Sequence, residues 1–346
     1  MIDLKAHLPY GLRQPRKDEL LLEHLTALTA HHRAQCPPYA RLLDALGPPP
    51  ATRVTDIPLL PAALFKTDWL ASVPADQVAK TLTSSGTTGQ TSRIPLDRQT
   101  AALQAQALLL IMTDFLGVQP LPMVIVDRPS TLADPHRFDA RAAAIRGMLA
   151  FGRQPFFALD EDMRLDAGGL KAFLAGLAGQ RVLVFGLTWI VWKHFVHQVA
   201  EAGLRFADAV LVHSGGWKQH EAEAVDNADF KARMLRMAGI GAVRNVYDMA
   251  EQVGSVFVEG ADGLLYPPWF ADAIIRDPLT LAPVPDGQPG VIQVVSLLPR
   301  SYPGHSILTE DLGVIEHVDW SAPGRCGKGL RILGRVPDGA DARLAP

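Results

Sequence analysis

Continuously apolar runs alternate with amphipathic segments through the middle of the chain. The runs are short and rich in β-branched residues, as strands buried on both faces are. They lie at residues 122–127 (PMVIVD), 181–185 (RVLVF), 209–213 (AVLVH) and 242–247 (AVRNVY). Helices are predicted at 17–33, at 99–116, after Gly186 and over 218–237, on the basis of helical periodicity. Strands that alternate with helices predict a mostly parallel sheet covered by helices, which is an α/β fold.

The pattern changes near Leu264, where short apolar runs are separated by proline and glycine. GLLYPPWF, GVIQVVSLL, GVIEHV and LRILGRV follow one another there, which is typical of a β-rich portion. We therefore predict three segments. They are an N-terminal helical segment with proline-rich connectors (1–80), an α/β core (81–262) and a β-rich closing portion (263–346).

Composition narrows the class of protein without changing this fold. With 346 residues, 48% hydrophobic and 20% charged, the chain is expected to be a soluble globular protein with a large core. The net charge of −3 and the lack of a dense Lys/Arg run argue against nucleic-acid binding. Cys36 and Cys326 form neither a disulfide framework nor a zinc set, which favours a cytoplasmic location.

Targeting and metal signals are weak. Residues 1–19 lack the apolar stretch of a signal peptide, and the most apolar helix, near 101–115, is too short and too polar for a membrane span. His31 and His32 end the first predicted helix without a matching carboxylate or cysteine set. We interpret them as surface histidines rather than metal ligands.

The stretch 83–93, TSSGTTGQTSR, carries the clearest candidate chemistry. Its hydroxyls and two glycines place many hydrogen-bond donors around a turn, which suits the oxygens of a polyphosphate. A Walker-type loop needs a lysine after its last glycine and then a helix, whereas Gln90 follows Gly89 and Pro95 interrupts the next run. The stretch therefore predicts a strand–loop–strand clip over a nucleotide; the alternative is a polar surface turn.

Polar residues follow the predicted strands at their carboxyl ends. Gly186 and Thr188 follow one strand, Ser214–Gly216 ends the next, and Tyr247 with Glu251 ends the fourth. Ligands of parallel α/β sheets bind at this edge, so a pocket is expected there.

Four motifs in one order carry a family resemblance. They are TSSGTTG (83–89), HSGGWK (213–218), YDMAEQ (247–252) and TEDLG (309–313), the last of which precedes LGRV (333–336). The chain resembles the adenylate-forming superfamily of acyl-CoA synthetases and, within it, the LuxE-type acyl-protein synthetases. PLLPAALFK (58–66) and FGLTW (185–189) favour that branch, and the resemblance covers nearly the whole chain.

The resemblance implies the large-domain architecture of this superfamily and a role for particular residues. The ATP and AMP ligands would be Ser84, Ser85, Gly86, Thr87, Thr88, Gly89, Ser214, Gly215, Gly216, Tyr247 and Asp311. Glu251 would hold Mg²⁺, and Arg335 would be the arginine of the closing hinge. The acid pocket would include Phe185, Gly186, Thr188 and Trp189.

The implied activity is ATP-dependent activation of a carboxylic acid, with fatty acid as the first expectation, and transfer of the acyl group to a thiol. The superfamily's small C-terminal domain and its lysine would be absent, so we hypothesise that Lys218 replaces that lysine; the alternative is a solvated lysine. The family's C-terminal cysteine is also missing from DGADARLAP, and Cys326 is interpreted as structural. An external acceptor follows: coenzyme A, a carrier protein or an acyl reductase.

Two alternatives stay open, and two further classes of enzyme are disfavoured. An acyl- or aryl-CoA ligase would use free coenzyme A. A protein of another class would be a nucleotide-binding partner subunit with weakened catalysis, which the alanine at position 250 and the missing cysteine favour. A P-loop kinase is disfavoured by Gln90, and a serine hydrolase by the lack of a G-x-S-x-G elbow.

Overall fold

The computed structural model describes residues 2–84, 91–133, 140–217, 223–319 and 324–336. The chain forms two compact units, Met1–Ile111 with Met249–Pro346 (unit 1) and Met112–Asp248 (unit 2). One boundary falls inside helix α4 (Arg98–Leu116), and the other follows strand β8 (Ala242–Tyr247). The division of the chain into three segments stays a prediction.

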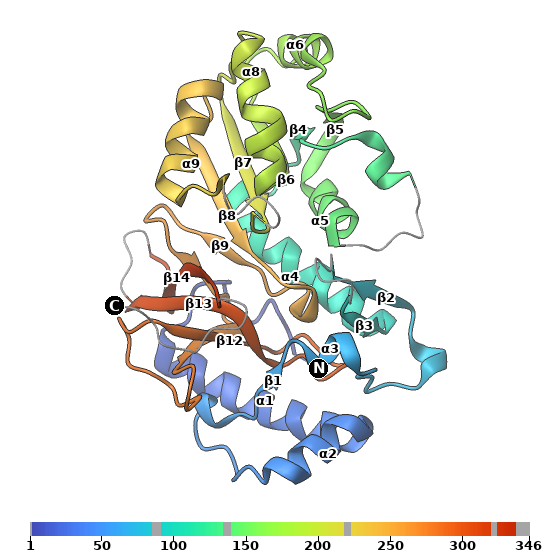
Figure 1. Cartoon of the computed structure of the whole chain (residues 1–346), viewed down its shortest axis with the longest axis vertical. Helices are drawn as coiled ribbons and strands as arrows, with labels where there is room; N and C mark the ends of the chain where they lie inside the picture. The colour runs from blue at the N-terminus through green and yellow to red at the C-terminus, as the bar shows by residue number, and fades with distance from the viewer. Residues whose placement is uncertain (1, 85–90, 134–139, 218–222, 320–323, 337–346) are drawn as a thin grey trace. The chain divides into compact units, whose positions relative to one another are not determined.

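Unit 2 contains a parallel sheet in the order β5-β4-β6-β7-β8. Its strands are β4 (Leu121–Ile125), β5 (Gly152–Phe157), β6 (Val182–Leu187), β7 (Ala209–Ser214) and β8. Its helices are α5 (Ala140–Met148), α6 (Ala167–Gly176), α7 (Thr188–Ile190), α8 (His197–Glu201) and α9 (Asn227–Arg233). Figure 1 shows the helices beside the strands. The predicted α/β fold class is confirmed.

The core of unit 2 explains why its strands are continuously apolar. Every residue of β6 and β7 is buried. Phe195, in the π-helical segment Val191–Val196, and Phe230, in α9, belong to the same buried cluster as these strands. Burying one such side chain stabilises the fold by about 1.5–3 kcal/mol, so the helices are held mainly by packing.

Unit 1 contains an antiparallel sheet in the order β11-β12-β13-β14-β10-β9. Its strands are β9 (Phe257–Glu259), β10 (Leu265–Tyr266), β11 (Ala271–Arg276), β12 (Gly290–Ser296), β13 (Ser306–Val318) and β14 (Lys328–Arg335). Strand β1 (Leu60–Pro61) pairs in parallel with β13. Strands β2 (Lys80–Thr83) and β3 (Arg93–Leu96) form a separate antiparallel pair. The predicted β-rich portion after Leu264 is confirmed.

Several helix boundaries differ from the sequence prediction. Helix α1 (Gln14–Gln35) begins three residues before its predicted start and ends near the expected prolines. Helix α2 (Pro37–Leu46), which was not predicted, begins at those same prolines. Proline is tolerated in the first turn of a helix, where its missing N–H has no intrahelical partner. Of the helix expected over 218–237, residues 218–222 lie outside the described residues. Helix α9 begins at Asn227, where the Asp226 side chain accepts from Asp229 N and caps it.

Helix α3 (Leu64–Thr67) also belongs to unit 1. Helix α1 buries one stripe of residues, spaced three or four apart. The stripe consists of Gln14, Lys17, Leu21, Leu25, Leu28 and His32. Three of these side chains are polar, so each must find a partner inside unit 1. Among the described residues, no helix is both long and apolar enough to cross a bilayer.

His32 is buried, so the expectation of surface histidines is wrong at this position. Its Nε2–H donates to Pro299 O over 3.2 Å, and Ser72 Oγ lies 2.7 Å from its Nδ1. The ring stacks on the equally buried His305 at 4.9 Å. Burial lowers the pKa of His32 well below its ordinary value and that of His305 to about 3. Both rings are therefore neutral at neutral pH.

These two histidines predict a loss of stability in mild acid. In the unfolded chain both protonate near pH 6.5, whereas in the fold protonation is delayed to lower pH, so stability falls as the pH drops below about 6.5. We expect the urea midpoint of unfolding to fall between pH 7 and pH 5. A His305→Gln variant, which keeps a side-chain N–H for Thr29, should show a shallower dependence. Equal dependences in the two proteins would contradict this role for His305.

A buried ionic cluster surrounds Asp272 in β11. Lys17 Nζ lies 3.3 Å from Asp272 Oδ1 and Lys328 Nζ lies 2.7 Å from Asp272 Oδ2, while Gln14 Nε2 donates to the same Oδ2 over 2.8 Å. The Lys17 and Asp272 side chains are 1% and 0% exposed. Burial alone would raise the pKa of Asp272, but the two lysines hold it below its ordinary value. The cluster ties α1 to β11 and to the start of β14.

Candidate functional site

The base of the predicted clip lies in unit 1, where β2 and β3 approach each other. Ser92 N donates to Ser84 Oγ over 2.9 Å, and Ser84 N donates to Ser92 O over 3.2 Å. The two strands are antiparallel, with Thr83 opposite Arg93. The two strands predicted on either side of the clip are confirmed. Outside the described residues lie Ser85, Gly86, Thr87, Thr88 and Gly89, whose contact with phosphates stays a prediction.

Glu251 lies in a short 3₁₀ turn, Ala250–Gln252. The side chain of the neighbouring Gln252 holds this turn in place. The buried Gln252 side chain donates to Val294 O over 3.0 Å and to Gly304 O over 2.9 Å. Gly304 lies so close that an added Cβ would be 2.6 Å from Glu251 O. Only glycine fits at this approach, and the backbone of Glu251 is therefore held in place.

The Glu251 carboxyl is 7% exposed, and burial raises its pKa. The nearby Ser92 hydroxyl lowers the pKa of Glu251 and so opposes the effect of burial. Within the described residues, the buried Ser92 Oγ makes no hydrogen bond with good geometry. The charge on Lys66, in α3, also favours the ionised carboxylate. A buried carboxyl beside a hydroxyl thus lies at the base of the clip.

The donors around Glu251 fit Mg²⁺ in their chemistry. Mg²⁺ prefers hard oxygen ligands and is usually held by one or two carboxylates together with water and substrate phosphates. Glu251 supplies one such oxygen donor, and Ser92 Oγ is a buried oxygen in need of a partner. In the described part of the chain, no three His, Cys, Asp or Glu residues come together as a metal site. A metal held by one protein carboxylate is compatible with this arrangement.

Asp311 and Arg335 face each other across β13 and β14. They are partners in the strand register, and Arg335 Nε lies 3.6 Å from Asp311 Oδ1. Arg335 also lies 3.3 Å from Glu310, which in turn lies 3.4 Å from Lys66. Asp311 N donates to Thr309 Oγ1 over 3.1 Å, which helps to fix Asp311 within β13. Their roles as ribose ligand and hinge arginine stay predictions.

In unit 2 the predicted adenine loop follows β7 directly. Ser214 is the last residue of the strand, and Gly215 has a φ of +77°, a conformation that glycine adopts without strain. A Cβ added to Gly216 would meet no atom within 4 Å. Tyr247 ends the neighbouring strand β8 and is half-buried. Ser214 and Tyr247 therefore end neighbouring parallel strands, as the sequence predicts.

Thr188 joins the ends of β6 and β7. Its Oγ1 lies 2.9 Å from His213 Nδ1 and donates to Ser214 O over 3.1 Å. Burial lowers the pKa of His213 to about 3, so its ring is neutral. Nothing in the sequence identified this link, because His213 and Thr188 are 25 residues apart.

The predicted acid-pocket residues lie at the end of β6 and in α7. Phe185 is buried, and Trp189 is half-buried. Gly186 packs so tightly that an added Cβ would lie 2.8 Å from both Val126 and Val191. Their contact with an acid stays a prediction.

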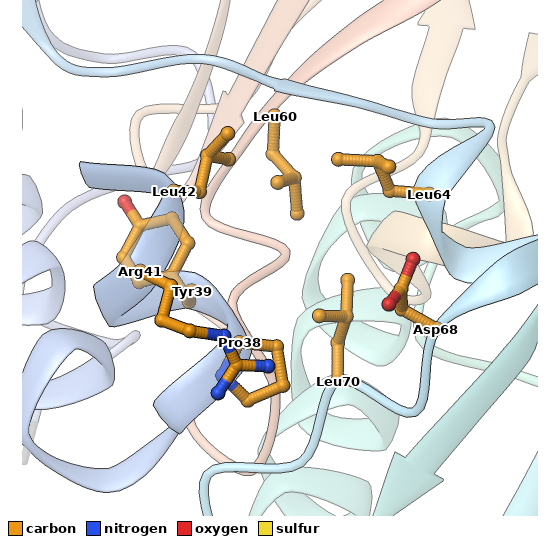
Figure 2. A pocket seen from close by; sticks show the side chains of 8 residues that line it. All are labelled: Pro38, Tyr39, Arg41, Leu42, Leu60, Leu64, Asp68 and Leu70. Carbon is orange, nitrogen blue, oxygen red and sulfur yellow. The ribbon is translucent and has the colours of Figure 1, made fainter. Parts of the chain in front are cut away.

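A cavity of about 210 Å³ lies elsewhere in unit 1. Figure 2 shows leucine side chains gathered around it, with the charged groups of Arg41 and Asp68 nearby. Its lining consists of Pro38, Tyr39, Arg41, Leu42, Leu60, Leu64, Asp68 and Leu70. It contains none of the predicted site residues, and we assign it no part in the site.

Two lysines, Lys218 and Lys66, and one cysteine, Cys326, are the remaining candidate residues. Lys218, which was hypothesised to take the role of the superfamily's C-terminal lysine, lies outside the described residues. Lys66 was missed as a candidate, because it ends the run PLLPAALFK, which indicated only the family branch. Cys326 is half-buried, and its N–H donates to Tyr10 O over 2.9 Å.

Comparison with known proteins decides the family. The family model described as "Acyl-protein synthetase, LuxE" matches residues 6–343. The chain belongs to the LuxE acyl-protein synthetase family. This membership confirms the resemblance and the predicted class of activity: an ATP-dependent acid–thiol ligase that activates a carboxylic acid and transfers the acyl group.

Two curated relatives are similar in sequence to this chain, and a solved structure shares its fold. A long-chain-fatty-acid–luciferin-component ligase of Vibrio harveyi is 26% identical over 293 residues, covering 78% of this chain and 72% of the relative. The corresponding ligase of Aliivibrio fischeri is 25% identical over 283 residues, covering 77% and 71%. A 2-hydroxyisobutyryl-CoA ligase, solved with 2-HIB-AMP and CoA, has the same fold. It is 18% identical, with a TM-score of 0.74 and coverage of 98% of this chain and 80% of that one.

Proposed function

We propose that this LuxE-family chain converts a long-chain fatty acid into its acyl-adenylate and passes the acyl group to a thiol on another protein. The observation that carries the proposal is the buried Glu251 carboxyl, which lies near Ser92 at the base of the hydroxyl-rich clip. The curated relatives are named as long-chain fatty acid ligases, which supports the choice of acid.

The difficult step brings two anions together, because a carboxylate attacks the α-phosphorus of ATP. At about 4 Å and an effective dielectric near 20, each pair of like charges costs roughly 4 kcal/mol. Mg²⁺, when bound, neutralises phosphate oxygens. Glu251 would hold the metal. Ser84 and the clip would donate hydrogen bonds to the phosphates, and Lys66 would add positive charge on the same unit.

The remaining roles follow the sequence prediction. Asp311 would accept hydrogen bonds from the ribose hydroxyls, and Arg335 beside it would move with the closing segment. The loop 214–216 and Tyr247 would bind the adenine and the adenylate. The thiol then attacks the acyl carbonyl and releases AMP.

A pyrophosphate-release assay with fatty, aromatic and short acids tests the function. We expect release only with ATP and a carboxylic acid, and fastest with long-chain fatty acids. Coenzyme A and a protein thiol, added in separate reactions, identify the acceptor, and mass spectrometry of the chain shows whether Cys326 is acylated. Release without any acid would contradict the proposal, and no release with any acid would favour a nucleotide-binding partner subunit.

A further inference from the structure

We propose that Thr188 is a positioning residue, whose hydroxyl fixes the loop 214–216 in the conformation that binds ATP. The inference rests on the proposed function, which assigns this loop to the adenine. It changes the role of Thr188, because the sequence places this residue in the acid pocket. All of its supporting contacts lie within unit 2.

One hydroxyl makes two hydrogen bonds of opposite sense. A carbonyl oxygen only accepts, so the Thr188 hydroxyl proton goes to Ser214 O at 3.1 Å. The same oxygen must then accept from His213 Nδ1–H at 2.9 Å. Thr188, His213 and Ser214 are all buried, so water does not replace either bond. Both bonds therefore depend on this hydroxyl.

The histidine has one compatible tautomer. Because Nδ1 carries the proton, Nε2 has only a lone pair, and it is buried without a hydrogen-bond partner in the described part of the chain. The ring packs against Phe230 at 4.5 Å between centroids. Turning the ring or moving the proton would break the bond to Thr188. The network thus has a single low-energy arrangement.

The position of these two hydrogen bonds explains why the loop 214–216 would change when the Thr188 hydroxyl is removed. Gly186 pairs with His213 and Leu187 with Ser214, and there the ladder between β6 and β7 ends. Thr188 is the next residue, at the start of α7, so its side chain continues the link between the strands for one more residue. The chain turns immediately afterwards at Gly215, whose φ is +77°. The direction of the Ser214 carbonyl therefore sets where the loop begins.

Two variants separate a positioning role from an acid-pocket role. Thr188→Val keeps the shape but removes the hydroxyl that accepts from His213 Nδ1–H and donates to Ser214 O, whereas Thr188→Ser keeps the hydroxyl. We expect T188V to raise KM for ATP about tenfold, because both buried hydrogen bonds that set the start of the loop are lost. The KM for the acid and kcat at saturating ATP should stay within about twofold of wild type. T188S should resemble wild type in all three.

Three results would overturn the inference. One is a T188V enzyme with an unchanged KM for ATP. Another is a change in acid KM or chain-length preference in both variants, which would place Thr188 in the acid pocket. The third is a wild-type protein without acid-dependent pyrophosphate release, which refutes the proposed function itself and is thus distinct from the first two.

A second pair of variants covers the case in which T188V does not fold. His213→Asn keeps a side-chain N–H near the position of Nδ1, whereas His213→Leu removes it. We expect the leucine variant alone to raise KM for ATP. Equal KM values for ATP in the two variants would overturn the inference.

Discussion

Replacing Glu251 with glutamine is expected to lower acid-dependent pyrophosphate release about a hundredfold, because losing a metal-holding carboxylate removes roughly 3 kcal/mol of transition-state stabilisation. The amide has the same shape and carries no charge to bury, so the melting temperature should be unchanged or higher. Activity and stability should therefore change independently. Steady-state kinetics across a range of Mg²⁺ concentrations, together with a thermal melt, measure both.

Glu316→Gln provides the matched control for this variant. Glu316 lies on β13, where it accepts from Arg331 Nε over 2.7 Å, and its side chain is 39% exposed. It is remote from the proposed chemistry, so its variant should keep wild-type activity. If E251Q is as active as E316Q at every Mg²⁺ concentration, Glu251 does not hold the metal.

Replacing Asp272 with asparagine is expected to cost about 3–5 kcal/mol of unfolding free energy, because breaking a buried ion pair leaves an uncompensated charge. Here two lysines lose their partner, and Lys17 is 1% exposed. Chemical denaturation of the full chain, monitored by circular dichroism or fluorescence, measures this loss of unfolding free energy. A second change, Lys17→Met, should recover part of it, since it removes one unpaired charge and keeps an apolar stem.

Asp44→Asn is the control for this prediction. Asp44 lies 2.6 Å from Arg33, and both side chains are about 60% exposed. Surface pairs of this kind contribute about 0–1 kcal/mol, so the control should be close to wild type. A loss in D272N no greater than in D44N would show that the buried cluster contributes little to stability.

Local sequence signals predicted the parts of the fold that depend on nearby residues. The clip follows from hydroxyls and glycines between two β-prone runs, and β8 (Ala242–Tyr247) agrees with its predicted bounds. Helix α2 was missed because the same prolines can end one helix and begin another. Asp226 decides where α9 begins, and capping depends on backbone geometry that periodicity does not show.

Long-range partners explain what the sequence could not show in the site. Nothing near Lys17 in the sequence indicates that it is buried. Its buried Nζ is paired with Asp272, 255 residues away, and donates to Pro267 O. His32 is buried for a similar reason, because Pro299 and Ser72 satisfy both ring nitrogens. Glu251 was predicted from its motif, whereas its burial and its closeness to Ser92 come from the fold.

Transfer of an oxygen isotope tests whether the acid is activated as an adenylate. The chain is incubated with ATP, Mg²⁺, a thiol acceptor and a fatty acid labelled with ¹⁸O in its carboxylate. Attack of that carboxylate on the α-phosphorus places one labelled oxygen in AMP once the thiol cleaves the acyl–oxygen bond. If the acid is activated as an adenylate, ¹⁸O appears in AMP and none appears in orthophosphate. Label in orthophosphate, or in neither product while thioester accumulates, would contradict it.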